Sequence, residues 1–139
     1  MKIIIPVAGI GSKLRPHTHT QPKALVPVAG KPILSHIVDY LVEGGYKEFI
    51  FIVGYLGDKI EDYVKSKYPH LKSSFVIQEP REGTGQAVWM AKELIHEGDE
   101  LLIVLGDTII DYDLHAIVTS PCSSLGIKKV DDPRQFGVA

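Results

Sequence analysis

Hydrophobic residues along this chain fall into short unbroken runs that are separated by polar or glycine-rich segments. Such runs, rich in β-branched residues, predict strands that are buried on both faces, because a strand covered on both sides shows no polar alternation. Four of these predicted strands lie at 2–7, 48–53, 74–78 and 100–105, and a fifth is expected at 125–130.

Between the predicted strands, apolar residues recur every three or four positions, as they do on the buried face of a helix. The first such segment spans 33–42 and stops at Gly44 and Gly45, and two more span 58–67 and 87–95. Strands that alternate with helices of this length indicate parallel crossover connections. We therefore expect a doubly wound α/β fold, with a mainly parallel sheet, helices on both faces and ligands beyond the carboxyl ends of the strands.

Composition restricts the class of protein. A chain of 139 residues, of which 45% are hydrophobic and 23% charged, is long enough for one core, so residues 1–139 are expected to form a single domain. A net charge of −2 gives no electrostatic reason to expect a nucleic acid polymer or an anionic membrane as partner. The chain has no long apolar run and passes directly into its first strand without the apolar segment of a signal peptide, so we expect a cytoplasmic protein.

Residues that often carry chemistry are unremarkable in most of the chain. The single cysteine, Cys122, excludes an internal disulfide and is expected on a surface loop. The six histidines show no metal-ligand spacing, so no zinc site is expected. Trp89 lies within a predicted helix, where packing in the core or in an interface is the favoured interpretation.

The first predicted strand runs into a glycine loop that carries cationic side chains. Gly9 and Gly11 allow backbone N–H groups to approach phosphate oxygens without a Cβ in the way. Lys13, Arg15 and Lys23 follow, and their charges suit a polyphosphate. The loop therefore predicts a binding site for a nucleoside triphosphate, and the residues expected to order it are Thr18, Thr20 and Gln21.

Other kinds of loop agree less well with this segment. A Walker A loop needs a Gly-Lys pair before its Ser or Thr, whereas Gly11 is followed by Ser12 and then Lys13. A dinucleotide fingerprint needs a third glycine where this chain has Leu14, and Pro16 argues against a continuing helix. A purely structural loop stays open on these residues alone, because Gly-x-Gly after a strand is common.

Three segments taken together resemble the sugar-1-phosphate nucleotidylyltransferases, also called nucleotide-sugar pyrophosphorylases. They read Gly-Ile-Gly-Ser-Lys-Leu-Arg-Pro at 9–16, Pro-Lys-Ala-Leu-Val-Pro-Val at 22–28 and Gly-Lys-Pro-Ile-Leu at 30–34. Residues 5–9 also resemble the opening of glucose-1-phosphate uridylyl- and thymidylyltransferases. The likeness covers the N-terminal, nucleotide-binding half of the family, so it implies a Rossmann-like nucleotidyltransferase fold that is apparently truncated.

The resemblance implies a reaction in which a nucleoside triphosphate and a sugar-1-phosphate give a nucleotide sugar and pyrophosphate, with Mg²⁺ as cofactor. Lys13 and Arg15 would hold the leaving phosphates and Lys23 the α-phosphate, while Asp107 would bind the metal and Gly137 would contact the sugar. Gln78 would read the base edge, and Gly83 would let the backbone approach the base. The full set expected to bind the nucleotide is Ala8, Gly9, Gly11, Ser12, Gln78, Gly83 and Thr84.

Lys13 departs from the family pattern, which has arginine at this place. An ammonium group keeps the charge but not the planar fork of donors, so either Lys13 or Arg15 is the principal cation. Thr84 also suits a helix N-cap and Asp107 a turn. The alternative function is a non-catalytic or truncated nucleotide-binding module, and the base, the sugar and homo-oligomer formation stay open.

Overall fold

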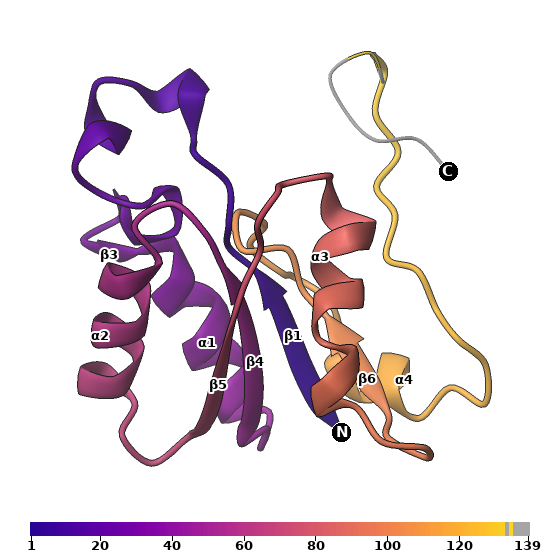
Figure 1. Cartoon of the computed structure of the whole chain (residues 1–139). Helices are drawn as coiled ribbons and strands as arrows, with labels where there is room; N and C mark the ends of the chain where they lie inside the picture. Colours follow the sequence, from indigo (N-terminus) through magenta and orange to yellow (C-terminus); the bar gives the residue numbers. More distant parts are fainter. Residues whose placement is uncertain (133, 135–139) are drawn as a thin grey trace.

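A parallel sheet of four strands runs through the fold, which is described by a computed structural model at residues 1–132 and 134 (Figure 1). The strands are β1 (Lys2–Pro6), β4 (Glu48–Val53), β5 (Lys72–Ile77) and β6 (Leu101–Ile103), in the order β5-β4-β1-β6. In the centre, Ile4 of β1 lies opposite Ile50 of β4 and Ile103 of β6. The predicted parallel sheet is confirmed.

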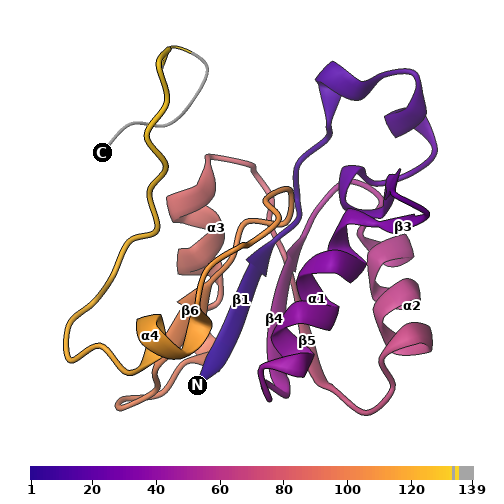
Figure 2. The same ribbon diagram turned by 180° about the vertical axis from the view of Figure 1, so that it is seen from behind.

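Helices cover both faces of this sheet, as Figures 1 and 2 show from opposite sides. One face carries α1 (Ile33–Glu43) and α2 (Gly57–Lys67), and the other carries α3 (Thr84–Met90). A short helix α4 (Leu114–Val118) follows β6, and β2 (Pro27–Val28) and β3 (Lys31–Pro32) form a small antiparallel pair. Among the described residues, no helix has the length and apolar character needed to cross a membrane.

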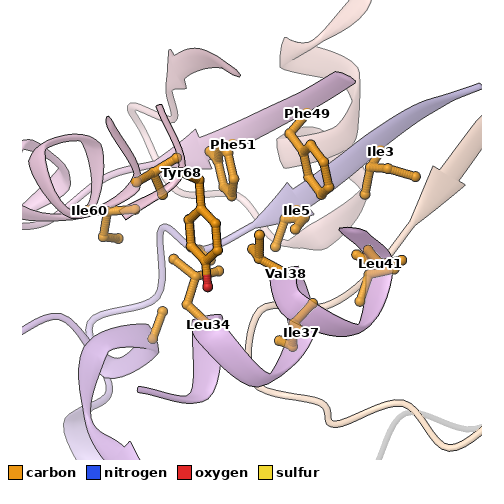
Figure 3. Close-up of a cluster of buried hydrophobic side chains, with 14 of the residues drawn as sticks. Ile3, Ile5, Leu34, Ile37, Val38, Leu41, Phe49, Phe51, Ile60 and Tyr68 are labelled. Atoms are coloured by element: carbon orange, nitrogen blue, oxygen red, sulfur yellow. The ribbon is translucent and has the colours of Figure 1, made fainter. Parts of the chain in front are cut away.

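The unbroken hydrophobic run of β4 has a direct structural cause, because its side chains alternate between two buried clusters. Phe49 and Phe51 face the cluster under α1 and α2, which Figure 3 shows, and the rings of Phe51 and Phe75 stack with centroids 5.4 Å apart. Ile50 and Ile52 point the other way, toward α3. Both faces of the central strands are therefore buried against helices.

The fifth strand predicted at 125–130 is absent, and this prediction was wrong. The segment has no strand partner among the described residues, and Leu125 and Ile127 are 74% and 71% exposed. Its pattern suits a strand, but a strand also needs a neighbour for its backbone hydrogen bonds and cover for its side chains. Residues 125–130 belong to neither of the two sheets of the described structure.

The predicted helix at 87–95 also differs from the structure. The helix begins earlier, at Thr84, ends at Met90, and is followed by a 3₁₀ turn at Lys92–Leu94. Trp89 is 66% exposed, with the Lys92 ammonium 5.1 Å from the centre of its ring, so it does not pack in the core, and packing in an interface stays a prediction. Cys122 is exposed, as predicted.

Candidate functional site

The loops that follow β1, β5 and β6 meet at one end of the sheet, at the top of Figure 1, and form a cleft of about 810 Å³. The cleft is of the size that small-molecule sites have. It brings together most of the residues predicted from the sequence, namely Ala8, Gly9, Gly11, Ser12, Lys13, Lys23, Gln78, Gly83, Thr84 and Asp107. Arg15 does not line it, and Gly137 lies outside the described residues.

Arg81 also lines the cleft and was not singled out from the sequence. It lies in the loop between β5 and α3, two residues before Gly83, and its guanidinium adds to the cationic groups of Lys13 and Lys23. The sequence does contain a signal for Arg81, because a cationic residue in a glycine-containing loop at the end of a parallel strand is a candidate phosphate ligand. The cleft therefore offers three basic side chains to an anionic ligand.

Gly11 holds the first loop in its conformation. Its φ is +66°, and a Cβ there would lie 2.9 Å from Thr18 Cγ2 and 3.0 Å from Lys23 Cβ. Thr18, which is buried, donates a hydrogen bond from Oγ1 to the Gly11 carbonyl at 2.8 Å. The glycine thus lets the loop pack directly on the segment that carries Lys23, which confirms that Thr18 orders the basic loop.

Gly83 holds the second loop in a backbone conformation of another kind. Its φ of +103° and ψ of 179° belong to a region that glycine occupies almost alone. A Cβ at Gly83 would meet nothing within 4 Å, so the backbone lies beside open space. Gly83 is itself the N-cap residue of α3, and no side chain caps this helix, so the expected capping role of Thr84 was wrong.

Lys23 and Asp107 form an ion pair across the cleft, although 84 residues separate them in the sequence. The Lys23 Nζ lies 2.5 Å from Asp107 Oδ2, and the two side chains are 34% and 46% exposed. The pair joins the loop after β1 to the loop after β6. Asp107 is therefore more than a turn residue, because its carboxylate faces the basic loop.

Gly106 is the residue that allows Asp107 to approach the first loop. Its N–H donates to the Pro6 carbonyl at 3.2 Å, and a Cβ at this position would lie 2.3 Å from Val7 Cγ1 and 2.8 Å from that carbonyl oxygen. Only a residue without a side chain fits so close to the end of β1. The chain direction after β6, and hence the position of Asp107, depends on this contact.

We expect Gly106→Ala to lower the free energy of unfolding by about 1–3 kcal/mol, because the added methyl group overlaps Val7 and the Pro6 carbonyl. Gly85→Ala is the matched control, since a Cβ at Gly85 meets nothing within 4 Å and should leave stability unchanged or raise it. Urea unfolding of both variants measures the difference. Equal stability of the two would show that the close contact at Gly106 relaxes freely.

The surroundings of Asp107 suit a site in which Mg²⁺ is bound partly by substrate better than a site built from protein ligands alone. Among residues 1–132 and 134, no group of three or more His, Cys, Asp or Glu side chains lies close enough together to hold a metal. Mg²⁺ commonly uses one or two carboxylates and takes its other ligands from water and substrate phosphates. One carboxylate beside a basic phosphate-binding loop is compatible with that mode.

A parallel sheet with a glycine-rich basic loop at its carboxyl end is the arrangement that α/β nucleotide-binding proteins have. The sequence narrows this class, because residues 2–139 match the family described as nucleotidyl transferase. The chain belongs to that family. This confirms the resemblance and the Rossmann-like nucleotidyltransferase fold expected from the sequence.

Relatives from several organisms share this similarity. The bifunctional protein GlmU of Methanococcus vannielii is 40% identical over 138 residues, which cover 99% of this chain and 32% of that protein. A mannose-1-phosphate guanyltransferase of Xenopus laevis is 34% identical and is covered to 41%. The chain thus spans about a third to two fifths of the length of these relatives.

Solved structures agree with the fold. HddC from Yersinia pseudotuberculosis, complexed with GMP-PN, superimposes with a TM-score of 0.73 at 30% identity, covering 84% of this chain and 52% of that one. A putative glucose-1-phosphate thymidylyltransferase from Bacillus anthracis gives a TM-score of 0.74 at 28% identity, covering 85% and 48%.

Proposed function

We propose that this chain is the nucleotide-binding part of a sugar-1-phosphate nucleotidyltransferase, which transfers a nucleoside monophosphate from a triphosphate to a sugar-1-phosphate. The observation that carries the proposal is the meeting of the glycine loop, the Lys23–Asp107 pair and Gln78 in one cleft. The names of related proteins support it, since they include a mannose-1-phosphate guanyltransferase and UDP-glucose pyrophosphorylases.

The chemistry needs positioning and neutralisation of charge more than proton transfer. An oxygen of the sugar phosphate attacks the α-phosphorus and forms a new P–O bond, while the bond from that phosphorus to the leaving pyrophosphate breaks. The nucleophile is already anionic, so no general base is required. Mg²⁺ on Asp107 would supply charge neutralisation at the reacting phosphate oxygens.

The basic side chains of the cleft take separate parts in this scheme. Lys13 lies in the glycine loop and would hold the leaving phosphates, and Lys23 would hold the α-phosphate and the incoming sugar phosphate. Arg15 lies outside the cleft lining, so the structure favours Lys13 as the principal cation of the loop. Gln78 and Gly83 would hold the base, next to open space beside the Gly83 backbone.

Two measurements test this function. Titration calorimetry with each nucleoside triphosphate and Mg²⁺ should detect binding of at least one, and exchange of labelled pyrophosphate into that triphosphate should detect turnover. Binding with turnover supports the enzyme, whereas binding without turnover supports the alternative of a nucleotide-binding module. A chain that binds none of the triphosphates would contradict both. A cytoplasmic location and formation of a homo-oligomer stay predictions from the sequence.

The choice between Lys13 and Arg15 gives a sharper prediction. We expect Lys13→Ala to weaken triphosphate binding by about 10- to 100-fold, the loss that corresponds to one charge-assisted hydrogen bond. Arg15→Ala should have a much smaller effect, and Lys13→Arg should preserve binding, because the charge stays in the cleft. Affinities of the three variants and of the double alanine variant measure this.

The double variant separates two ways in which these cations can act. If Lys13 alone contacts the phosphates, the double variant should bind like Lys13→Ala, whereas shared contacts would make the two losses non-additive. A larger loss in Arg15→Ala than in Lys13→Ala would reverse the assignment.

A further inference from the structure

Two glutamine side chains, Gln78 and Gln86, are joined beside the cleft by a chain of hydrogen bonds. Gln78 Nε2 donates to the Gly83 carbonyl at 3.0 Å and to Gln86 Oε1 at 2.5 Å. Gln86 Nε2 in turn donates to the Pro80 carbonyl at 3.0 Å. Gln78 directly follows β5 and is 6% exposed, whereas Gln86 lies half-buried in the first turn of α3.

The orientation of both amides follows from the two backbone carbonyls at the ends of this chain. A carbonyl oxygen only accepts hydrogen bonds, so Pro80 requires the NH₂ group of Gln86, and this turns Gln86 Oε1 toward Gln78. Gly83 and Gln86 therefore both require the NH₂ group of Gln78. Turning either amide by 180° would place two acceptors against each other.

One polar atom of Gln78 is left for a ligand, its carbonyl oxygen. Both N–H groups are used within the protein, and no donor among the described residues bonds to Oε1. The Gln78 carbonyl oxygen has no partner in the part of the chain that the structure describes but is not fully buried, and Gln78 lines the cleft. A free amide offers a donor and an acceptor together, but this one offers only an acceptor.

We propose that Gln86 is a positioning residue for base selection, which fixes Gln78 so that its carbonyl oxygen accepts a hydrogen bond from an N–H group of the bound base. The inference rests on the proposed function, because it needs a nucleotide in the cleft. Gln78 then has no N–H group to donate to a carbonyl oxygen of the base, so a donor for that oxygen must come from another residue. The two-bond pairing that an amide can make with adenine is excluded, because it requires the NH₂ group.

Two variants of Gln86 with opposite hydrogen-bonding character test this role. In Gln86→Glu the bond to the Pro80 carbonyl is lost, but the introduced carboxylate only accepts, so it still requires the NH₂ group of Gln78 and preserves the orientation of that amide. In Gln86→Lys the introduced ammonium only donates, and a charge-assisted bond draws the Gln78 carbonyl oxygen away from the base. Both side chains are long and favour helices, so the backbone of α3 should not change.

The measurement is a ratio of two affinities for each protein. The tightest-binding triphosphate is chosen from ATP, CTP, GTP, UTP and dTTP, and it is compared with its analogue in which methyl groups replace the N–H hydrogens of the Watson–Crick edge, such as N3-methyl-UTP. Both ligands carry the same phosphates, so the charge introduced at position 86 cancels in the ratio. Wild type and Gln86→Glu should prefer the unmethylated nucleotide by about tenfold, the value of one hydrogen bond.

Gln86→Lys should bring this ratio close to one, while Trp89→Ala, an exposed change on the same helix, should leave it at the wild-type value. Gln86→Met removes the amide without adding charge and should also lower the ratio, which keeps the test decisive if the lysine variant does not fold. Equal ratios in wild type and all three Gln86 variants would overturn the role of Gln86 and leave the proposed function intact. Failure of the wild type to bind any triphosphate would overturn both.

Discussion

Replacing Asp107 with asparagine is expected to remove the magnesium dependence of nucleotide binding while the fold is preserved. The amide keeps the shape and a neutral oxygen but lacks the charge that binds a hard cation. Stability should change little, because the ion pair with Lys23 is partly exposed and such pairs contribute about 1 kcal/mol or less. Triphosphate affinity, titrated at increasing Mg²⁺ concentration, should rise in the wild type and stay nearly constant in Asp107→Asn.

Asp111→Asn is the matched control for this experiment. Asp111 follows β6 closely in the sequence and is exposed, but it does not line the cleft. It should retain the magnesium dependence of the wild type, so a general effect of lost negative charge near the site would be seen in both variants. If Asp107→Asn and Asp111→Asn showed the same magnesium dependence of nucleotide binding, Asp107 would not be the metal ligand.

The sheet and the position of the cleft were predictable because they follow from local sequence patterns. The β4 run alternates between two hydrophobic clusters, so its lack of polar residues carried information about both faces at once. Parallel connections then place the glycine loops at one end of the sheet, whatever the details of their conformation. This topology brings Lys13, Lys23, Gln78 and Asp107 to the same end of the sheet, where all four line the cleft.

Contacts between distant segments could not be predicted in this way. The Lys23–Asp107 bond depends on how closely β6 approaches β1, which Gly106 permits through its missing side chain. No sequence pattern singles out Gln86. The direction in which the Gln78 amide points follows from the Gly83 and Pro80 carbonyl groups, which fix both amides in the folded structure. These are properties of three-dimensional packing, not of residue spacing.

The wrong predictions have equally specific causes. Trp89 was expected in the core or in an interface, and it does not lie in the core because Ala87 and Ala91, four residues apart, occupy the side of α3 that packs on the sheet. A residue midway between them points to the opposite side of the helix. The strand expected at 125–130 had a suitable pattern, yet pairing requires a neighbouring strand, which a local pattern cannot supply.

Replacing Lys23 with methionine is expected to change the affinities for nucleotide and for metal in opposite directions. Lys23 cannot neutralise a phosphate and pair with Asp107 equally well, because one ammonium serves both. Methionine removes the charge but keeps the methylene groups that lie beside Gly11, so it is a better choice than alanine. Binding of the magnesium–triphosphate complex should weaken by about 10- to 100-fold, the loss of a charge-assisted hydrogen bond.

The same change frees the Asp107 carboxylate for a cation. Affinity for Mn²⁺ alone, measured by water proton relaxation without nucleotide, should rise by up to about fivefold, the limit set by an exposed ion pair of about 1 kcal/mol. Lys31→Met is the control, since Lys31 pairs with Asp39 away from the cleft and should alter neither affinity. A loss of nucleotide binding with no gain in Mn²⁺ binding would mean that Lys23 does not compete with the metal. If Lys23→Met had wild-type affinity for both the magnesium–triphosphate complex and Mn²⁺, Lys23 would have no role in the site.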